Sequence, residues 1–247
     1  MQQAFIRRLL FFMNNTNNLG QVLRRHRHDF APVLDADLNA DCVCTLDFTL
    51  ANLALQNTDL QNTTVFSAAV KQMLLERNAT IGVGGYLEDR FIYRRSQHFD
   101  TQAKSRNLHL GVDVWIDEDT AVFTPLDARV HSFQDNNNFG DYGPTIILEH
   151  ELEGITFYTL YGHLSRASLD GLEVGKAFAK GEKIAEVGPY PENGNWPPHL
   201  HFQIICSMEG RYGDYPGVAT TEERLGYEAL CPDPNLILQC RHLPLDL

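Results

Sequence analysis

The sequence of 247 residues has few basic side chains and no long hydrophobic run. No stretch approaches the about 20 apolar residues that a transmembrane helix needs. Only 20 Lys and Arg stand against 32 Asp and Glu, which gives a formal net charge of -12. Because phosphates are bound mainly by Lys and Arg, this balance argues against nucleic acid and against an anionic membrane surface. We therefore expect no nucleic-acid partner and no membrane partner.

Cysteine is also scarce, and no secretion signal is found. An odd number of cysteines in a chain of this length predicts reduced thiols instead of a disulfide framework; the five are Cys42, Cys44, Cys206, Cys231 and Cys240. The apolar run at 9–13 is shorter than the core of a secretory signal peptide, and no small-residue cleavage site follows it. The sequence therefore predicts a cytoplasmic location, unless another route exports the protein to the cell envelope.

The first third of the chain has a mixed pattern. Residues 1–28 have a helical period, and a strand followed by a turn is expected within 31–62. Thr64 is the expected cap of the amphipathic helix that follows it. We therefore expect a mixed α/β N-terminal region over 1–79.

From Thr80 onward the pattern changes to short β-branched and aromatic runs separated by Gly, Pro and Asn. Such spacing is typical of a β-rich domain. The stretch TIGVGGYLEDRFIYRR predicts two short strands around a turn, and Glu153-Gly154 predicts the turn of a hairpin. The chain is therefore expected to be mainly β, with its β domain over 80–247.

Two histidines stand two residues apart in PPHLHFQII, where a strand is predicted to begin. Residues i and i+2 of a strand face the same side about 6.5 Å apart, so His199 and His201 face one space while Leu200 faces the core. Two rings at this separation can bind one metal ion, or one can bind the ion while the other reaches a substrate. Because such a pair rarely serves packing, it indicates a functional site.

An imidazole and a carboxylate stand four residues apart in NLHLGVDVW. On a straight strand His109 and Asp113 would lie about 13 Å apart, too far to share an ion, but a bend at Gly111 would let them converge. A further histidine, His163, follows a predicted strand in YGHLS. Two imidazoles and a carboxylate with an open fourth position make a catalytic zinc site, and the extra histidines suit acid–base work or oxyanion stabilisation. The remaining histidines lack such company: His26, His28, His98, His131, His150 and His242.

In this order, HLGVDV, YGHLS and HLHFQI resemble the three signatures of the lysostaphin/LytM-type zinc metallopeptidases, which cut peptide bonds in bacterial peptidoglycan. The resemblance implies a lysostaphin-like antiparallel β-sheet domain with a groove. It implies one Zn²⁺ per chain, with His109, Asp113 and His201 as its ligands. It also implies that His163 and His199 are the catalytic pair, which do not bind the metal.

Residues 80–240 are further similar to a subgroup of this family that occurs as a domain fused to class III aminotransferases. This similarity implies an aminotransferase-type protein as a partner. The loop YPENGNWPP before the last motif departs from the family, which commonly has a turn rich in Ser, Thr and Gly there. Because substrate would enter at this loop, Asn195 and Trp196 are the expected substrate-binding residues.

The sequence thus predicts a zinc-dependent metalloendopeptidase in which a zinc-activated water hydrolyses a peptide bond of peptidoglycan or a related peptide. Two alternatives remain open. A regulatory or binding module would hold zinc without hydrolysis. A structural zinc site, however, usually has four protein ligands, and the sequence offers three candidates. A histidine phosphocarrier of related architecture also uses two neighbouring histidines, but phosphoryl transfer has no need of Asp113.

Overall fold

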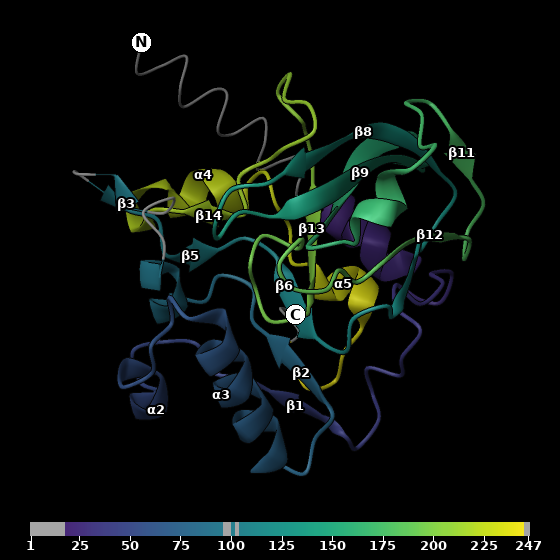
Figure 1. Ribbon diagram of the computed structural model, residues 1–247. Helices are drawn as coiled ribbons and strands as arrows, with labels where there is room; N and C mark the ends of the chain where they lie inside the picture. The colour runs from purple at the N-terminus through teal and green to yellow at the C-terminus, as the bar shows by residue number, and fades with distance from the viewer. Residues whose placement is uncertain (1–17, 96–99, 102–103, 245–247) are drawn as a thin grey trace.

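An eight-stranded sheet forms the centre of the molecule in the computed structural model (Figure 1). All neighbouring strands are antiparallel except the first two, which run parallel. The prediction of a mainly β fold with a large antiparallel sheet is therefore confirmed. In spatial order the strands are β1 (Val43–Thr45), β2 (Ile81–Gly84), β6 (Val112–Trp115), β13 (Leu200–Ile205), β10 (Ile155–Gly162), β9 (Gly143–Leu152), β8 (Ala128–Asn136) and β11 (Ala177–Phe178).

The structure describes residues 18–95, 100–101 and 104–244. Three short pairs complete the strands: β12 (Lys183–Glu186) with β7 (Ala121–Phe123), β14 (Val218–Ala219) with β5 (Leu108–His109), and β3 (Asp100–Thr101) with β4 (Lys104–Ser105). Several helical segments surround the sheet. They are residues 18–25, α2 (Leu53–Gln56), α3 (Thr63–Leu75), η1 (Phe91–Arg95), η2 (Arg166–Leu169), η3 (Thr221–Glu223), α4 (Arg224–Glu228) and α5 (Asn235–Leu238).

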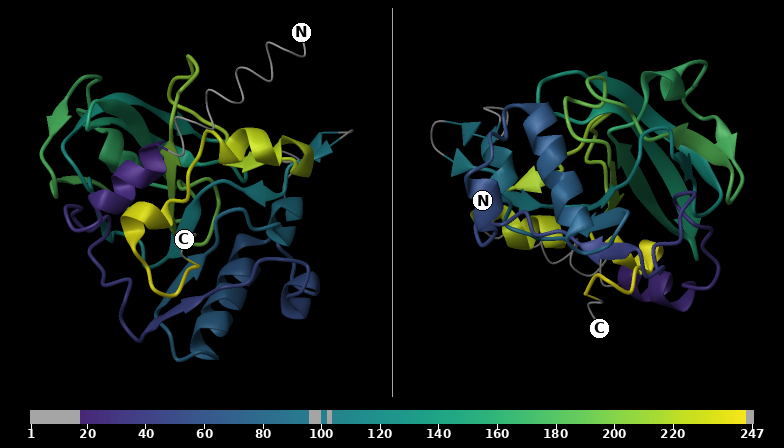
Figure 2. Two further views of the ribbon diagram at one scale, coloured as in Figure 1. Left: turned by 180° about the vertical axis from the view of Figure 1, so that it is seen from behind. Right: turned by 60° about the horizontal axis from the view of Figure 1, so that its bottom comes forward.

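Helices cover the two ends of the sheet differently. Figures 1 and 2 show α2 and α3 beside the β1–β2 end, away from the long strands β8 and β9. The helix over residues 18–25 lies beside α5 in the two views of Figure 2, and Leu19, Leu23 and Ile237 belong to one buried cluster. The two ends of the described chain therefore share a core with the central sheet.

Strand β13 is buried along its whole length, so both faces of the sheet are covered there. Leu200, Phe202 and Ile204 point into the largest hydrophobic cluster. His201 and Gln203 point to the opposite face, as the two-residue period of a strand requires. The predicted alternation around Leu200 is thus found in the structure, and it places polar side chains on one face only.

Local expectations before residue 100 are partly wrong. The second short strand expected in TIGVGGYLEDRFIYRR is the 3₁₀ helix η1, in which the consecutive residues Ile92 and Tyr93 are both buried. The cap of α3 is Asn62, whose side chain accepts hydrogen bonds from the amides of Thr64 and Val65; Thr64 lies inside the helix. The part of the expected helix before residue 18 lies outside the described residues.

The expected hairpin is confirmed at Glu153-Gly154. Both residues have positive φ, 51° and 74°, which is the twist that a two-residue hairpin turn requires. Ile155 pairs with Leu152 directly across the turn, so β9 and β10 form one long ribbon.

The strand β1, from the region before residue 80, extends the same sheet as β2 and β6. The division of the chain into 1–79 and 80–247 stays a prediction. In the described part of the chain, no helix combines the length and the apolar character that crossing a membrane would require.

Candidate metal centre

Two neighbouring strands and a bend place three potential ligands together. Asp113 in β6 lies directly opposite His201 in β13, so their side chains share one face of the sheet. The chain leaves the strand conformation at Leu110 and Gly111, between β5 and β6, and this bend brings His109 to the same place. A bend at Gly111 was the arrangement that would let His109 and Asp113 converge, and the structure has this bend.

Gly111 has a second role that the sequence did not reveal. A Cβ atom at this position would lie 2.5 Å from Cε1 of His201 and 2.8 Å from the carbonyl oxygen of Phe202. Both distances are far below van der Waals contact. The absence of a side chain at Gly111 therefore lets the His201 ring lie directly against the backbone of the bend.

The three ligand atoms form a small triangle. Nε2 of His109 lies 3.0 Å from Nδ1 of His201 and 3.2 Å from Oδ1 of Asp113, and Nδ1 of His201 lies 3.0 Å from the same oxygen. All three residues are buried. In a tetrahedral zinc site with bonds of about 2.0–2.1 Å, neighbouring donor atoms lie about 3.3 Å apart. The triangle thus matches one face of such a tetrahedron.

Hydrogen bonds fix which nitrogen of each ligand ring faces the triangle. Nδ1 of His109 lies 3.1 Å from the carbonyl oxygen of Gly85, so it carries the proton and leaves Nε2 with a lone pair. Nε2 of His201 lies 3.0 Å from Oε1 of Gln203, whose amide donates to the Pro216 carbonyl. These outer partners hold the two rings in orientations that would suit ligands of a metal ion.

Charge and burial act on the same atoms. Burial lowers the pKa of His109 to about 3, so its ring is neutral at pH 7. Burial alone would raise the pKa of Asp113, but the neighbouring His109 and Arg90 hold it well below its ordinary value. Two imidazoles and one carboxylate are the donor set that suits Zn²⁺, and the residues present therefore fit this ion.

A second pair of histidines lies beside the triangle. The ring centroids of His163 and His199 are 4.1 Å apart, and Nε2 of His199 lies 3.8 Å from Oδ2 of Asp113. Each Nδ1 donates a hydrogen bond to a backbone carbonyl at 2.8 Å, that of Asn193 for His163 and that of Pro197 for His199. Burial lowers the pKa of His163 well below its ordinary value and that of His199 to about 4. Both rings are therefore neutral, with Nε2 able to accept a proton.

A cluster of aromatic side chains packs against His199 of this pair. The Trp115 ring stacks on His199 with centroids 4.1 Å apart and an interplanar angle of 13°. Phe48 packs against Trp115 at 4.8 Å, and Phe66 lies within 6.0 Å of the same indole. Phe48 and Phe66 come from the region before residue 80, which thus contributes directly to the setting of the histidines.

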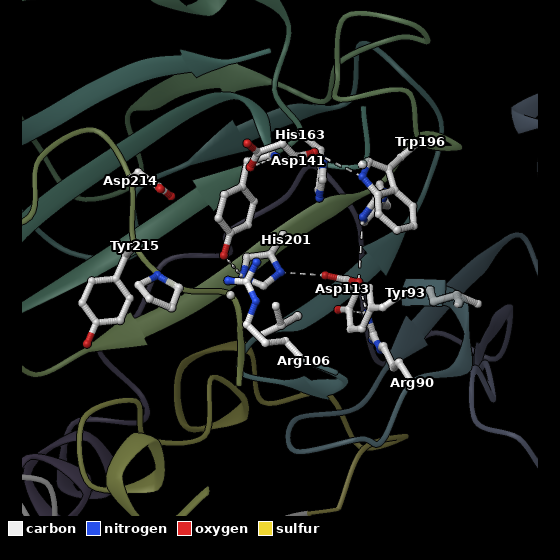
Figure 3. Close-up of a pocket in the computed structure, with 17 residues that line it drawn as sticks. Arg90, Tyr93, Arg106, Asp113, Asp141, His163, Trp196, His201, Asp214 and Tyr215 are labelled. Carbon is white, nitrogen blue, oxygen red and sulfur yellow. Dashed lines mark hydrogen bonds and ion pairs between the residues drawn. The ribbon is translucent and has the colours of Figure 1, made fainter. Parts of the chain in front are cut away.

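A cavity of about 110 Å³ opens over these groups (Figure 3). Trp196 lies in its wall, where its indole N–H donates to the Asp141 carbonyl at 3.2 Å. Asn195 is not among the lining residues; its carbonyl accepts a hydrogen bond from Thr63 at 2.8 Å. The lining consists of Arg90, Ile92, Tyr93, Arg106, Asp113, Gly140, Asp141, Tyr142, His163, Trp196, His199, His201, Asp214, Tyr215, Pro216, Gly217 and Val218.

Sequence reasoning gave no role to three residues of this site. Arg90 is buried and forms ion pairs with Asp113 and, at 2.8 Å, with Glu88. Tyr93 covers the site beside His109, and the Tyr142 hydroxyl lies 3.4 Å from Nε2 of His201. The only signal was an arginine within the apolar stretch RFIY, and residue type alone does not separate a buried arginine from a solvated one.

Comparison with known proteins connects this geometry with a family. Residues 107–212 match the model of Peptidase family M23. Solved structures to which parts of this chain are similar include a zinc-containing peptidase from Vibrio cholerae (24% identity over 40% of this chain and 27% of that chain, TM-score 0.30). They also include the catalytic domain of the antimicrobial peptidase lysostaphin from Staphylococcus simulans (23% identity, 49% and 80%, TM-score 0.35) and Helicobacter pylori Csd3 (25% identity, 53% and 34%, TM-score 0.32). The matched part thus spans well under half of two of these proteins. No curated protein sequence matches the chain.

Proposed function

We propose that this chain, whose residues 107–212 match Peptidase family M23, acts as a zinc-dependent metalloendopeptidase on peptidoglycan or a related peptide. One observation carries the proposal. His109, Asp113 and His201 present three ligand atoms within 3.2 Å of one another, beside a pair of neutral histidines on one cavity. A site built only to hold zinc would need a fourth protein ligand. Among the described residues this group has three members, and two of them, Asp113 and His201, line the cavity.

Zinc held by this triangle would supply a Lewis acid and lower the pKa of a bound water to about 7. The chain supplies the groups that handle protons. His163 and His199 are each held by a backbone carbonyl at Nδ1, so that Nε2 faces the cavity and can accept a proton from water. Once protonated, the same nitrogen can donate to the leaving amine or to a developing oxyanion.

Tyrosine and tryptophan side chains shape the cavity around these atoms. Burial, with Asp214 and other acidic groups nearby, raises the pKa of Tyr142 well above its ordinary value, so its hydroxyl stays protonated and can donate a hydrogen bond. Tyr93 and Trp196 are almost fully buried and exclude water from the side of the histidines. Such walls suit a peptide backbone with small side chains better than a bulky one. Trp196 is thus the better supported of the two expected substrate-binding residues, and an aminotransferase-type partner stays a prediction.

Metal content and hydrolysis together test this function. We expect about one zinc per chain by elemental mass spectrometry in the wild type, and loss of that zinc in Asp113→Ala. We also expect the zinc-loaded wild type to cleave purified peptidoglycan, or peptides with Gly or D-Ala at the scissile bond, and a chelator to stop cleavage. Zinc without cleavage of any of these substrates would favour the non-hydrolytic binding module. Absence of zinc after reconstitution would contradict the proposal as a whole.

A further inference from the structure

Arg90 occupies an unusual place for an arginine. Its guanidinium is buried, and its Nε donates to Glu88 at 2.8 Å while one terminal nitrogen donates to Oδ2 of Asp113. The same nitrogen lies 3.2 Å from the hydroxyl of Tyr93. The rings of Phe48 and Tyr93 lie 5.5 Å and 5.8 Å from the guanidinium carbon. These contacts hold the guanidinium through Nε and one terminal nitrogen, whereas the other terminal nitrogen has no hydrogen-bond partner among the described residues.

This guanidinium contacts the carboxylate of the ligand triangle on the side away from the two histidines. Arg90 binds Oδ2 of Asp113, whereas Oδ1 of the same carboxylate faces His109 and His201. A carboxylate with one oxygen held in this way presents the other to a metal ion in a fixed direction. A buried cation beside the carboxylate also reduces the electron density that this ligand donates. Arg90 lies before residue 107, outside the segment that matches the family model.

We propose that Arg90 is the positioning residue of the metal centre, holding Asp113 in the single orientation in which Oδ1 completes the ligand triangle. This inference rests on the proposed function, because it concerns the same site. It explains why a guanidinium is needed. A lysine ammonium is a point charge and does not offer the planar fork that joins Glu88 and Asp113 at the same time.

Gly84 provides an independent way to test the geometry. It lies opposite Asp113 in the pairing of β2 with β6. A Cβ atom at Gly84 would lie 2.6 Å from a terminal nitrogen of Arg90, and its other nearest atoms, Cζ of Arg90 and Cδ2 of Phe48, are at 3.7 Å. The missing side chain of Gly84 therefore leaves the space that the guanidinium fills. Gly84→Ala should displace Arg90 without removing its charge.

The experiment measures zinc affinity of the full chain by competition with a chelator, together with the visible spectrum of the cobalt-substituted protein. We expect Arg90→Lys to weaken zinc binding by about 10- to 100-fold, the range for removing a partner of a metal ligand, and to shift the cobalt bands. Gly84→Ala should weaken binding in the same direction. In the double variant Gly84→Ala adds little, because lysine lacks the nitrogen that the new methyl group would meet.

Two matched controls separate positioning from folding. Arg211→Lys changes another arginine that pairs with a glutamate (Glu209, at 3.0 Å) and lies over a tyrosine ring, and Gly226→Ala adds a methyl group with no atom within 4 Å. Both should leave zinc affinity within about twofold. If Arg90→Lys lowers the thermal stability of the metal-free protein but leaves its zinc affinity and cobalt spectrum unchanged, Arg90 is a core residue only and the inference is wrong. If the wild type itself binds no zinc, the proposed function fails first.

Discussion

The two faces of the central sheet each bury a histidine with a depressed pKa, yet among the described residues only one face brings together three groups that could hold a metal ion. On the face opposite the triangle, His150 donates or accepts at both ring nitrogens, to the Asp127 carbonyl at 3.1 Å and to the Thr159 hydroxyl at 2.7 Å. Burial lowers its pKa to about 4, the same value as for His199. Burial and pKa therefore do not distinguish these two histidines.

The difference lies in where the lone pairs point. Around His150 each polar atom has its own partner, and the ring stacks on Phe157 with centroids 5.0 Å apart. Around Asp113 the lone pairs of two rings and one carboxylate converge on a shared point. A group of closely satisfied hydrogen bonds stabilises a core, whereas converging acceptors need a cation. Convergence, and not burial, is what identifies the functional face.

The largest expected contrast comes from removing one histidine on each face. His201→Ala should abolish zinc binding and lower kcat/KM by at least about 10⁴-fold, because one of three ligands is lost. His150→Gln should leave both zinc content and kcat/KM within about twofold of the wild type. Elemental mass spectrometry and a peptide cleavage assay check both variants. Retained zinc in His201→Ala would contradict the ligand assignment.

A second contrast separates the histidines within the functional face. His199→Ala should lower kcat by about 10²–10⁴-fold, the usual contribution of a general acid–base group, and keep its zinc. The reason is that the three atoms proposed to bind zinc belong to His109, Asp113 and His201, and none belongs to His199. Single-turnover kinetics with zinc-loaded protein measure the rate constant of the cleavage step. Loss of zinc together with activity would instead place His199 among the ligands.

A smaller effect is expected from the bend. Gly111→Ala would place a methyl group 2.5 Å from Cε1 of His201, so the ring must move away from its two fellow ligands. We expect zinc affinity to fall about tenfold, with the fold retained. Titration with a chelator measures it. Gly226→Ala, where the new methyl group meets nothing within 4 Å, is the control. Equal affinities would show that the strand before Asp113 adjusts without cost.

The smallest effect concerns the pH dependence of stability on the other face. His150 has a pKa of about 4 when folded and about 6.5 when unfolded, so the unfolded state binds more protons between these values. Its stabilising contribution is complete above about pH 6.5 and is lost as the pH falls toward 4. His150→Gln should reduce the loss of unfolding free energy between pH 7 and pH 5 by roughly 1–2 kcal/mol. Urea unfolding at both pH values is the measurement, and identical losses would contradict the pKa.

Sequence reasoning reached the parts of the site that local spacing determines. The i and i+2 rule placed His199 and His201 on one face, and the strand geometry required a bend at Gly111. It failed where contacts join distant segments. Nothing in the sequence shows that Arg90 meets Asp113, because their meeting depends on how β2 and β6 pair. Sequence reasoning also expected a second short strand in TIGVGGYLEDRFIYRR, where residues 91–95 form a 3₁₀ helix, because aromatic and β-branched residues suit either structure when they are buried.

The aromatic contact between Trp115 and His199 has a consequence for how such a protein can be divided. The Trp115 ring is also packed by Phe48, whose ring centre lies 5.5 Å from the guanidinium carbon of Arg90. A fragment cut at the limits of the family match would begin at residue 107 and leave this indole open to water. The segment that matches the family model therefore does not include all the residues that pack around the site. Phe48 and Arg90, both outside that segment, would have to be kept in any fragment meant to preserve the surroundings of Trp115 and Asp113.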